Sequence, residues 1–411
     1  MKKRTPFGKI GRDWSSLGDC SNLPIQKLEL SRRITMSTLL HRLYRLINRP
    51  LVHIALAFIA GTIAGYVLLL YFLVSSVQPD PGQFTEINPI YLETDVSGLI
   101  TLHNDEDVTV RRNELIHYIW GDEGFPSEAP EVVENIVDER YAGLRNLKEI
   151  HKLTINMEWG LVSIAYHFVP TKSNNQLIVY HQGHRGDFIA GINVIQAFLD
   201  EGYSVVGMAM PLMGLNNQPV VDLNRFGRLK LTSHDHLAFL DFKNGHPIKL
   251  FVYPVAVVVN YAHQYGYQAV HMVGISGGGW TTTLSAALDP RLSHSYPVAG
   301  SLPNYLRSEF PGDSGDYEQV LPELYRIANY PELYILGSYG RGRKQLQVLN
   351  QYDSCCFAGV RYKTYESIIQ ERLSALGEGS FAVFLDTTHR EHIISNKALE
   401  VIINDLTGEN S

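Results

Sequence analysis

One short stretch, residues 270–280, restricts the possible folds of this chain more than any other. An apolar run, Val270–Ile275, leads into Ser276, which has glycines on both sides, and a helix-prone segment follows. This pattern predicts a strand, a tight turn and a helix. In such a turn, side chains at the flanking positions would collide with each other or with the strand, and glycine removes the collision. We therefore expect Ser276 above the edge of a sheet, at the start of a helix.

A serine in that position is suited to attack a carbonyl group, because the helix N-terminus favours developing negative charge. The residues Gly274-Ile275-Ser276-Gly277-Gly278 fit the nucleophile elbow. A bare Gly-x-Ser-x-Gly also occurs by chance, and glycines after a strand often serve only a tight loop or a phosphate site. The context favours the elbow, because Thr281–Leu288 is followed by Asp289-Pro290, a helix with a stop signal.

The length of 411 residues allows one large α/β domain with an appendage. The three cysteines, Cys20, Cys355 and Cys356, exclude a disulfide scaffold and match no zinc spacing. His234-Asp235-His236 could suggest a metal site, but no other ligand cluster lies near it in the sequence. We interpret these residues as part of a loop or cap, and we expect neither a metal nor a cofactor.

Charge is distributed unevenly along the chain. The first fifty residues hold eleven Lys and Arg against three Asp and Glu, while the whole chain has a net charge of −7. The remainder is therefore acidic and offers no basic patch for a phosphate backbone, so nucleic acid is not an expected partner.

Residues Leu51–Val74 contain no Asp, Glu, Lys or Arg. As a helix, they would be about 36 Å long, against about 30 Å for the hydrocarbon core of a bilayer. The alternative is a cleaved signal peptide with a site near Val74-Ser75-Ser76, but the apolar run is roughly twice the usual length. Arginines before the run and acidic residues after it predict a single-pass protein with a cytoplasmic N-terminus and a periplasmic or other extracytoplasmic domain.

These observations predict four regions. Residues 1–50 are a basic cytoplasmic segment, 51–76 a transmembrane anchor, 77–150 a linker with an N-terminal extension, and 151–411 the main domain, with a cap at about 211–246. Within the extension, residues 131–147 are expected to be helical. In the main domain, strands are expected at 151–157, 162–169, 176–180, 203–209, 270–275, 296–300, 332–336 and 380–385, with helices between most of them. This alternation requires a mostly parallel sheet.

The loop after the third of these strands, residues 181–187, is the second informative motif. Acyl-transferring hydrolases place one backbone N–H of the oxyanion hole in a glycine-containing turn at this point, opposite the N–H after the nucleophile. We expect His184 or Gly183 to supply the first N–H and Gly277 the second. Asp187 is interpreted as a helix N-cap.

A serine hydroxyl needs a general base, and the base needs a carboxylate on its other ring nitrogen. The order Ser276, Asp353, His392 in this chain resembles that of the α/β-hydrolase superfamily over roughly residues 151–406. The resemblance implies a mostly parallel eight-stranded sheet flanked by helices, with the nucleophile after the fifth strand, the acid after the seventh and the histidine after the eighth. The chain is similar to a membrane-anchored member of this superfamily, a serine esterase or lipase.

Two positions depart from the superfamily pattern. Asp353 lies sixteen positions past Gly337, so an insertion of about one helix is needed between the seventh strand and the acid, and Asp386 is the alternative acid. His392 immediately precedes the closing helix, as the superfamily histidine commonly does, whereas His389 is the alternative base.

The expected function is hydrolysis of a carboxylic ester of a small-molecule or acylated substrate through an acyl-enzyme. An amide or peptide hydrolase would share the machinery, and a non-catalytic binding module would share only the fold. Cys355 and Cys356 lie two and three positions after the expected acid. They could form a vicinal disulfide, but adjacent cysteines do not easily reach the usual separation, so packing as free thiols is the favoured interpretation.

Overall fold

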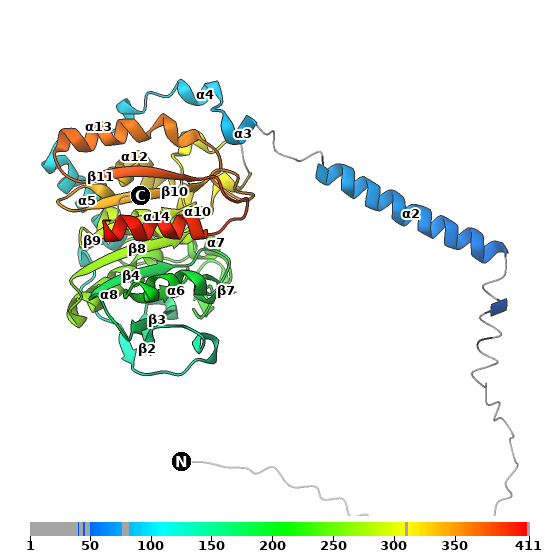
Figure 1. The fold of residues 1–411 in the computed structure, drawn as a ribbon, viewed down its shortest axis with the longest axis horizontal. Coiled ribbons are helices and arrows are strands. Elements are labelled where there is room, and N and C mark those ends of the chain that lie inside the picture. Colours follow the sequence, from blue (N-terminus) through cyan, green and yellow to red (C-terminus); the bar gives the residue numbers. More distant parts are fainter. Residues whose placement is uncertain (1–39, 41–43, 46–49, 76–81, 309–310, 409–411) are drawn as a thin grey trace, which may run out of the picture. The chain divides into compact units, whose positions relative to one another are not determined.

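The computed structural model describes residue 40 and residues 44–45, 50–75, 82–308 and 311–408 (Figure 1). The chain divides into two compact units, Met1–Gln78 and Pro79–Ser411. Most of the basic segment expected at 1–50, together with Cys20, lies outside the described residues.

The first unit contains one long helix, α2, over Pro50–Ser75. Its described side chains include exposed Ile54, Phe58, Ile63 and Tyr66. Within the residues that the structure describes, no helix has the length and apolar character needed to cross a membrane.

The second unit is built on a nine-stranded sheet with the order β1-β2-β3-β5-β4-β8-β9-β10-β11 (Figure 1). The pairs β1–β2, β2–β3 and β3–β5 are antiparallel, and the other five pairs are parallel. A separate two-stranded sheet joins β6 and β7. The strands are β1 Glu131–Val133, β2 Leu147–Asn156, β3 Val162–Pro170, β4 Gln176–His181, β5 Ser204–Met208, β6 Val220–Leu223, β7 Gly227–Lys230, β8 Ala269–Ile275, β9 Leu292–Val298, β10 Lys344–Asn350 and β11 Ser380–Asp386.

Helices cover the sheet. Helices α8, α9, α12 and α13 pack on one another and on strands β4 and β8–β11, while α6 packs against β3–β5 and against α14, which contacts β11. The α-helices of this unit are α3 Gly82–Thr85, α4 Pro89–Leu92, α5 Asp105–Trp120, α6 Ile192–Asp200, α7 His234–Leu237, α8 Lys249–Tyr265, α9 Gly277–Leu288, α10 Tyr317–Val320, α11 Pro322–Ile327, α12 Tyr330–Ser338, α13 Glu366–Leu376 and α14 Asn396–Thr407.

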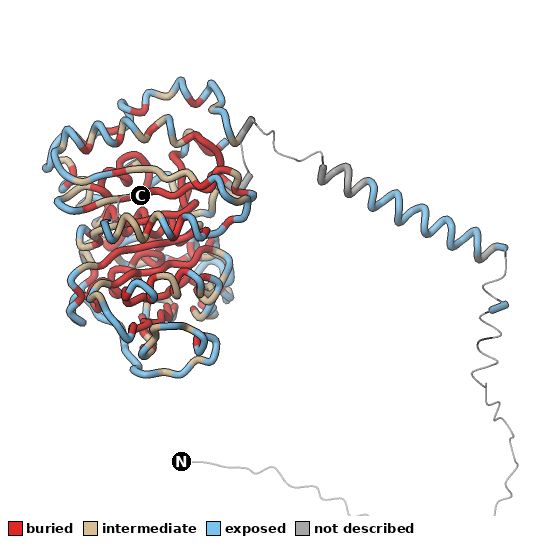
Figure 2. Tube along the Cα trace, viewed as in Figure 1, coloured by how far each residue is buried: buried red, intermediate tan, exposed pale blue. Residues whose placement is uncertain are grey.

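The central parallel strands are the most deeply buried part of this unit, whereas the outer helices keep an exposed side (Figure 2). Every residue of β5 is buried, as are the last six of β8, and such strands read as continuous apolar runs because both faces are covered. Helix α14 follows the amphipathic rule, since Ala398, Leu399 and Ile402 enter the core while Lys397 and Glu400 are exposed.

The sheet has one strand more than expected. Residues 131–147, predicted to be helical, contain β1 and the short 3₁₀ turn Glu139–Tyr141 instead. Strand β1 pairs in antiparallel register with β2, with Val132 opposite Leu153. This long-range pairing overrides the local helical pattern.

The strand expected at residues 332–336 is wrong, since these residues belong to helix α12. The side chain of Asn329 accepts a hydrogen bond from the backbone of Glu332, and the Glu332 side chain accepts from the backbone of Asn329, which is a capping box. All nine residues of α12 are buried, so the sequence shows no helical period. The strand of this region is β10, and Asp353 follows it after only two residues, so no inserted helix is needed.

Candidate active site

The nucleophile candidate, Ser276, lies in the turn between β8 and α9 with φ 59° and ψ −124°. Such a conformation is strained for a residue with a side chain. The turn is held by its backbone, because Ser276 N–H donates to the carbonyl of Val298 at 2.9 Å. The strain and the hydrogen bond together fix the serine at the end of the central strand.

Glycine is required around this serine because backbone atoms come very close. A Cβ atom added to Gly274 would lie 2.1 Å from the carbonyl oxygen of Gly278, and one on Gly278 would lie 2.1 Å from that of His181. Real Cβ atoms essentially never approach backbone so closely. The glycines of the elbow are thus explained by the tightness of the turn, as the sequence pattern predicts.

Asp353 and His392 come together at the ends of β10 and β11. Nδ1 of His392 donates to Oδ2 of Asp353 at 2.7 Å, and both residues are buried. Two backbone N–H groups, those of Cys355 and Cys356, donate to Oδ1 of the same carboxylate at 2.8 and 3.1 Å. The carboxylate therefore accepts hydrogen bonds on both oxygens and is fixed in orientation toward the imidazole.

Asn350, the last residue of β10, is a further contact of this pair that the sequence did not single out. Its Nδ2 donates to Oδ2 of Asp353 at 3.2 Å and to the carbonyl of Ile393 at 3.0 Å. The amide thereby joins the carboxylate to the loop that carries His392. An asparagine at the end of a buried strand is the only sequence signal for this role.

The cysteines beside the acid are bonded to each other. Cys355 and Cys356 form a disulfide, so their interpretation as free thiols is wrong. The reason is local, because the turn after β10 folds the backbone around the Asp353 carboxylate and places the two sulfur atoms together.

Ser276 and His392 line one cavity of about 300 Å³. Nε2 of His392, the ring nitrogen not bonded to Asp353, is buried and has no hydrogen-bond partner within the described part of the chain. The other residues around the cavity are His184, Arg185, Gly315, Asp316, Gln319, Cys355, Cys356 and Phe357. A cavity of about 310 Å³ elsewhere, around Trp120, Met157 and Lys249, contains none of the expected site residues.

The alternative acid and base lie together, but in other surroundings. Nε2 of His389 is 3.3 Å from Oδ2 of Asp386. Asp386 accepts hydrogen bonds from Thr388 and from Ser395, and Ser395 Oγ in turn accepts from the first turn of α14. Burial alone would raise the pKa of Asp386, but these hydrogen bonds keep it below its ordinary value. Neither residue is among the described residues that line the cavity with Ser276.

The loop after β4 lies directly against the elbow. A Cβ atom on Gly183 would be 2.6 Å from Cβ of Ser276, and one on Gly277 would be 2.5 Å from Cε1 of His184. Gly277 is the first residue of α9, where backbone N–H groups have no intrahelical partner. Asp187 caps the next turn by accepting from Ile189 N–H, as expected.

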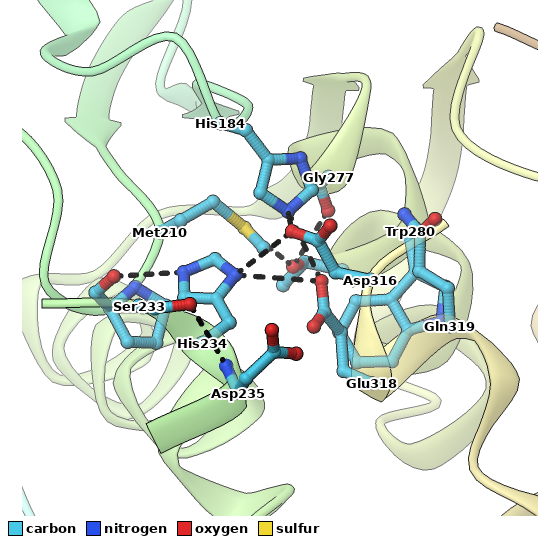
Figure 3. A network of polar contacts seen from close by, with 12 residues as sticks. His184, Met210, Ser233, His234, Asp235, Gly277, Trp280, Asp316, Glu318 and Gln319 are labelled. Atoms are coloured by element: carbon cyan, nitrogen blue, oxygen red, sulfur yellow. Dashed lines mark hydrogen bonds and ion pairs between the residues drawn. The ribbon is translucent and has the colours of Figure 1, made fainter. Parts of the chain in front are cut away.

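A second polar cluster adjoins the cavity, the His–acid cluster of His184, His234, Asp316 and Glu318 (Figure 3). Nε2 of His184 lies 2.9 Å from Oδ2 of Asp316 and 3.1 Å from Oε1 of Glu318. Nδ1 of His234 lies 3.6 Å from each of the same two oxygens. The sequence did not reveal this cluster, because its members come from three segments that are far apart along the chain.

The two histidines of the His–acid cluster have perturbed protonation. Burial alone would lower the pKa of His184 and of His234, but the contacts with Asp316 and Glu318 outweigh burial and raise each pKa to about 9. Contacts with the two histidines lower the pKa of Asp316. In Glu318, the same contacts overcome the effect of burial and also lower the pKa. Positive charge is therefore favoured between the two carboxylates.

No protein-family model and no curated protein matches the sequence. Acetyl xylan esterase 1 from Thermoanaerobacterium sp. JW/SL YS485 is similar in structure, with 15% identity, a TM-score of 0.49, and coverage of 80% of this chain and 100% of that one. Methylesterase BT1017 has 15% identity and a TM-score of 0.48, with coverage of 82% of this chain and 66% of that one. An S-formylglutathione hydrolase from Agrobacterium tumefaciens has 15% identity and a TM-score of 0.43, with coverage of 67% of this chain and 96% of that one. Because these TM-scores are below 0.5, the α/β-hydrolase-like fold of this chain rests on its own strand order and elbow geometry.

Proposed function

We propose that this protein is a serine hydrolase that cleaves a carboxylic ester, with Ser276 as nucleophile, His392 as general base and Asp353 as the orienting acid. One observation carries the proposal. Nδ1 of His392 is bonded to Asp353, whereas Nε2 has no hydrogen-bond partner among the described residues, and this histidine lines the same cavity as a serine held in a strained elbow.

The chemistry follows from these positions. Nε2 of His392 takes the proton of the Ser276 hydroxyl as the oxygen attacks the ester carbonyl, and Asp353 stabilises the imidazolium that forms. The backbone N–H of Gly277 and one from the Gly183–His184 turn stabilise the oxyanion. The imidazolium then protonates the leaving alcohol, and a water molecule, deprotonated by the same nitrogen, hydrolyses the acyl-enzyme.

A fluorophosphonate probe tests the activated serine. We expect it to label the folded protein and to lose its site in Ser276→Ala, while Ser374→Ala, on the exposed side of α13, keeps the label. Absence of labelling on well-folded protein would contradict the proposal and favour a binding module.

The substrate class needs a separate experiment, because an amide hydrolase would carry the same label. A cavity of about 300 Å³ lies at the lower end of the range usual for small-molecule sites. We therefore expect short-acyl esters to be cleaved faster than long-acyl esters and peptides. Preferential peptide cleavage by the same serine would assign the protein to the amide-hydrolase alternative.

We also propose that the protein is a single-pass membrane protein whose second unit lies outside the cytoplasm. The support comes from the sequence, namely the uncharged run Leu51–Val74 and the arginines before it, whereas the described part of α2 does not itself have the length and apolar character of a spanning helix. Cell fractionation with N-terminal sequencing of the mature protein tests the location. An intact N-terminus in the membrane fraction is expected, and a mature start at Val77 in the soluble fraction would mean a secreted enzyme instead.

A further inference from the structure

We propose that the His–acid cluster is a binding site for one Zn²⁺ ion, separate from the Ser276 chemistry. Zinc is commonly bound by neutral histidine nitrogens and carboxylate oxygens in a tetrahedral arrangement. The cluster offers two of each, and its four ligand atoms all lie within 4.8 Å of one another. Figure 3 shows these side chains converging on a common point.

The four nitrogen–oxygen distances in the cluster are compatible with a tetrahedral ion. Four ligands at about 2.1 Å from a central ion are about 3.4 Å apart along the edges of the tetrahedron. The four nitrogen–oxygen distances in the cluster are 2.9, 3.1, 3.6 and 3.6 Å. Each of these four distances lies within about 0.5 Å of the ideal edge, and all four ligand atoms lie within 4.8 Å of one another.

The hydrogen bonding of His234 selects the nitrogen that faces the site. Its Nε2 lies 3.0 Å from the carbonyl oxygen of Pro211, which can only accept, so Nε2 carries the proton. In the neutral ring, the Nδ1 lone pair then points toward Asp316 and Glu318. Histidines that bind metals almost always donate their other N–H in this way.

Burial makes an uncompensated cluster costly. The Glu318 side chain is 0% exposed, and its Oε2 has no hydrogen-bond partner within the described residues. Nδ1 of His234, whose side chain is 5% exposed, also has no hydrogen-bond partner there. Two carboxylates need two positive charges nearby, and a single divalent ion at the centre would supply both and take the unpartnered Nδ1 of His234 as a ligand.

The ion would hold three segments together beside the cavity. His184 comes from the loop after β4, His234 from α7, and Asp316 and Glu318 from the start of α10. Since His184 packs on Gly277, zinc would also fix the loop expected to provide one oxyanion N–H. Four protein ligands fill the tetrahedron, so the site is structural and takes no part in the chemical step.

Metal analysis of the full-length protein in detergent, purified without chelating resin, tests the proposal. We expect about one zinc per chain. After removal with a chelator, Zn²⁺ should rebind in calorimetry and restore the lost melting temperature, and Co²⁺ should give the visible absorption of a four-coordinate site. Asp316→Asn should weaken Zn²⁺ binding by roughly 100-fold or more, as should His234→Ala.

Neighbouring residues of the same types provide matched controls. Asp235→Asn and His236→Ala alter the helix α7 beside His234, outside the ligand set, and should bind zinc like the wild type. Asp316 is half-exposed, so its asparagine variant should fold even if His234→Ala does not. Equal zinc affinity in the wild type and Asp316→Asn would overturn the proposal and leave protonated imidazoles as the compensating charge. Fluorophosphonate labelling tests Ser276 separately, so the zinc site and the proposed function can fail independently of each other.

Discussion

At the scale of single residues, two acid–histidine pairs lie near the end of the sheet and differ in what surrounds them. Asp353 holds His392 by a 2.7 Å hydrogen bond, and the other ring nitrogen of that histidine has no hydrogen-bond partner in the part of the chain that the structure describes. Asp386 accepts hydrogen bonds from Thr388 and Ser395, and Ser395 in turn caps the start of α14. The Asp353–His392 pair is arranged for proton transfer, whereas the contacts of Asp386 stabilise the loop before α14.

This difference predicts opposite effects for two similar substitutions. Asp353→Asn should lower kcat by about 10⁴, because an amide cannot hold the imidazole in the required tautomer. His392→Ala should cost a similar factor, since such groups act as a unit. Turnover of a short-acyl ester, measured beside a thermal melt, gives both values.

Asp386→Asn is the matched control for the acid. It should lower the melting temperature by weakening the contacts with Thr388 and Ser395, while kcat stays within a few-fold of the wild type. Loss of activity in Asp386→Asn, with Asp353→Asn active, would reverse the assignment of the acid without changing the class of enzyme.

The sequence singles out candidate site residues where a strong local pattern or the chain order marks them. Ser276 is marked by its glycines, and Asp353 and His392 by their places in the chain order. Asp316 and Glu318 have no such signal, because they come from a polar excursion whose position beside His184 depends on tertiary folding. The triplet His234-Asp235-His236 is visible in the sequence, but the carboxylates that His234 contacts are about eighty positions farther along the chain.

At the scale of elements, the turn after β10 links the redox state of two cysteines to the position of the acid. Residues Asp353 to Cys356 form this turn, and the N–H groups of both cysteines bind the Asp353 carboxylate. The disulfide joins the same two residues. Opening the bridge frees the backbone that orients the acid.

We therefore expect the double variant Cys355→Ser/Cys356→Ser, or treatment with reductant, to lower kcat about 10-fold. This is less than the roughly 100-fold that a 1 Å displacement of a catalytic group can cost. Labelling of Ser276 should slow but persist. Cys20→Ser is the control, and mass spectrometry of the unreduced peptide checks the bridge. Two alkylatable thiols in that peptide, or full activity in the double variant, would contradict the link.

The error in placing the strand that precedes the acid has a clear physical cause. Strand β10 has buried glutamines, Gln345 and Gln347, where a buried strand usually has apolar residues. Gln347 is satisfied by Ser301 O and by the hydroxyl of Tyr365, which only the folded chain brings together. Helix α12, buried on all sides, has the apolar run expected of a strand. Because both elements are buried and neither shows its usual sequence period, the strand was predicted in the segment that forms α12 and not in the segment that forms β10.

At the scale of the whole second unit, parallel pairing places the expected site. Strands β8, β10 and β11 run parallel with β9 between β8 and β10, so their carboxyl ends lie at one edge of the sheet. Ser276, Asp353 and His392 follow these three ends in turn, and ligands of open α/β sheets bind outside such ends. The alternation of strands and helices sufficed to predict a mostly parallel sheet, although neither β10, which precedes Asp353, nor the added strand β1 was among the predicted strands.

The same buried sheet encloses histidines that make stability depend on pH. His167 is bracketed by the hydroxyls of Tyr261 and Tyr267, and His271 contacts Gln176. Burial lowers the pKa of each to about 3. In the unfolded chain these histidines have a pKa near 6.5, so below that pH the unfolded state binds more protons than the native state. The contribution of these two histidines to the free energy of unfolding is therefore fully present above about pH 6.5 and is lost as the pH decreases toward 3.

Between pH 6.5 and 5, where most carboxylates remain ionised, each of the two histidines should lower the free energy of unfolding by roughly 1.5 kcal/mol. Urea denaturation at several pH values measures this slope. In His271→Gln, the decrease in the free energy of unfolding between pH 6.5 and 5 should be smaller by the contribution of one histidine. This holds whatever the stability of the variant at neutral pH. His263→Gln, an exposed change on α8, should keep the wild-type slope. An unchanged slope in His271→Gln would mean that this histidine accepts a proton inside the folded sheet.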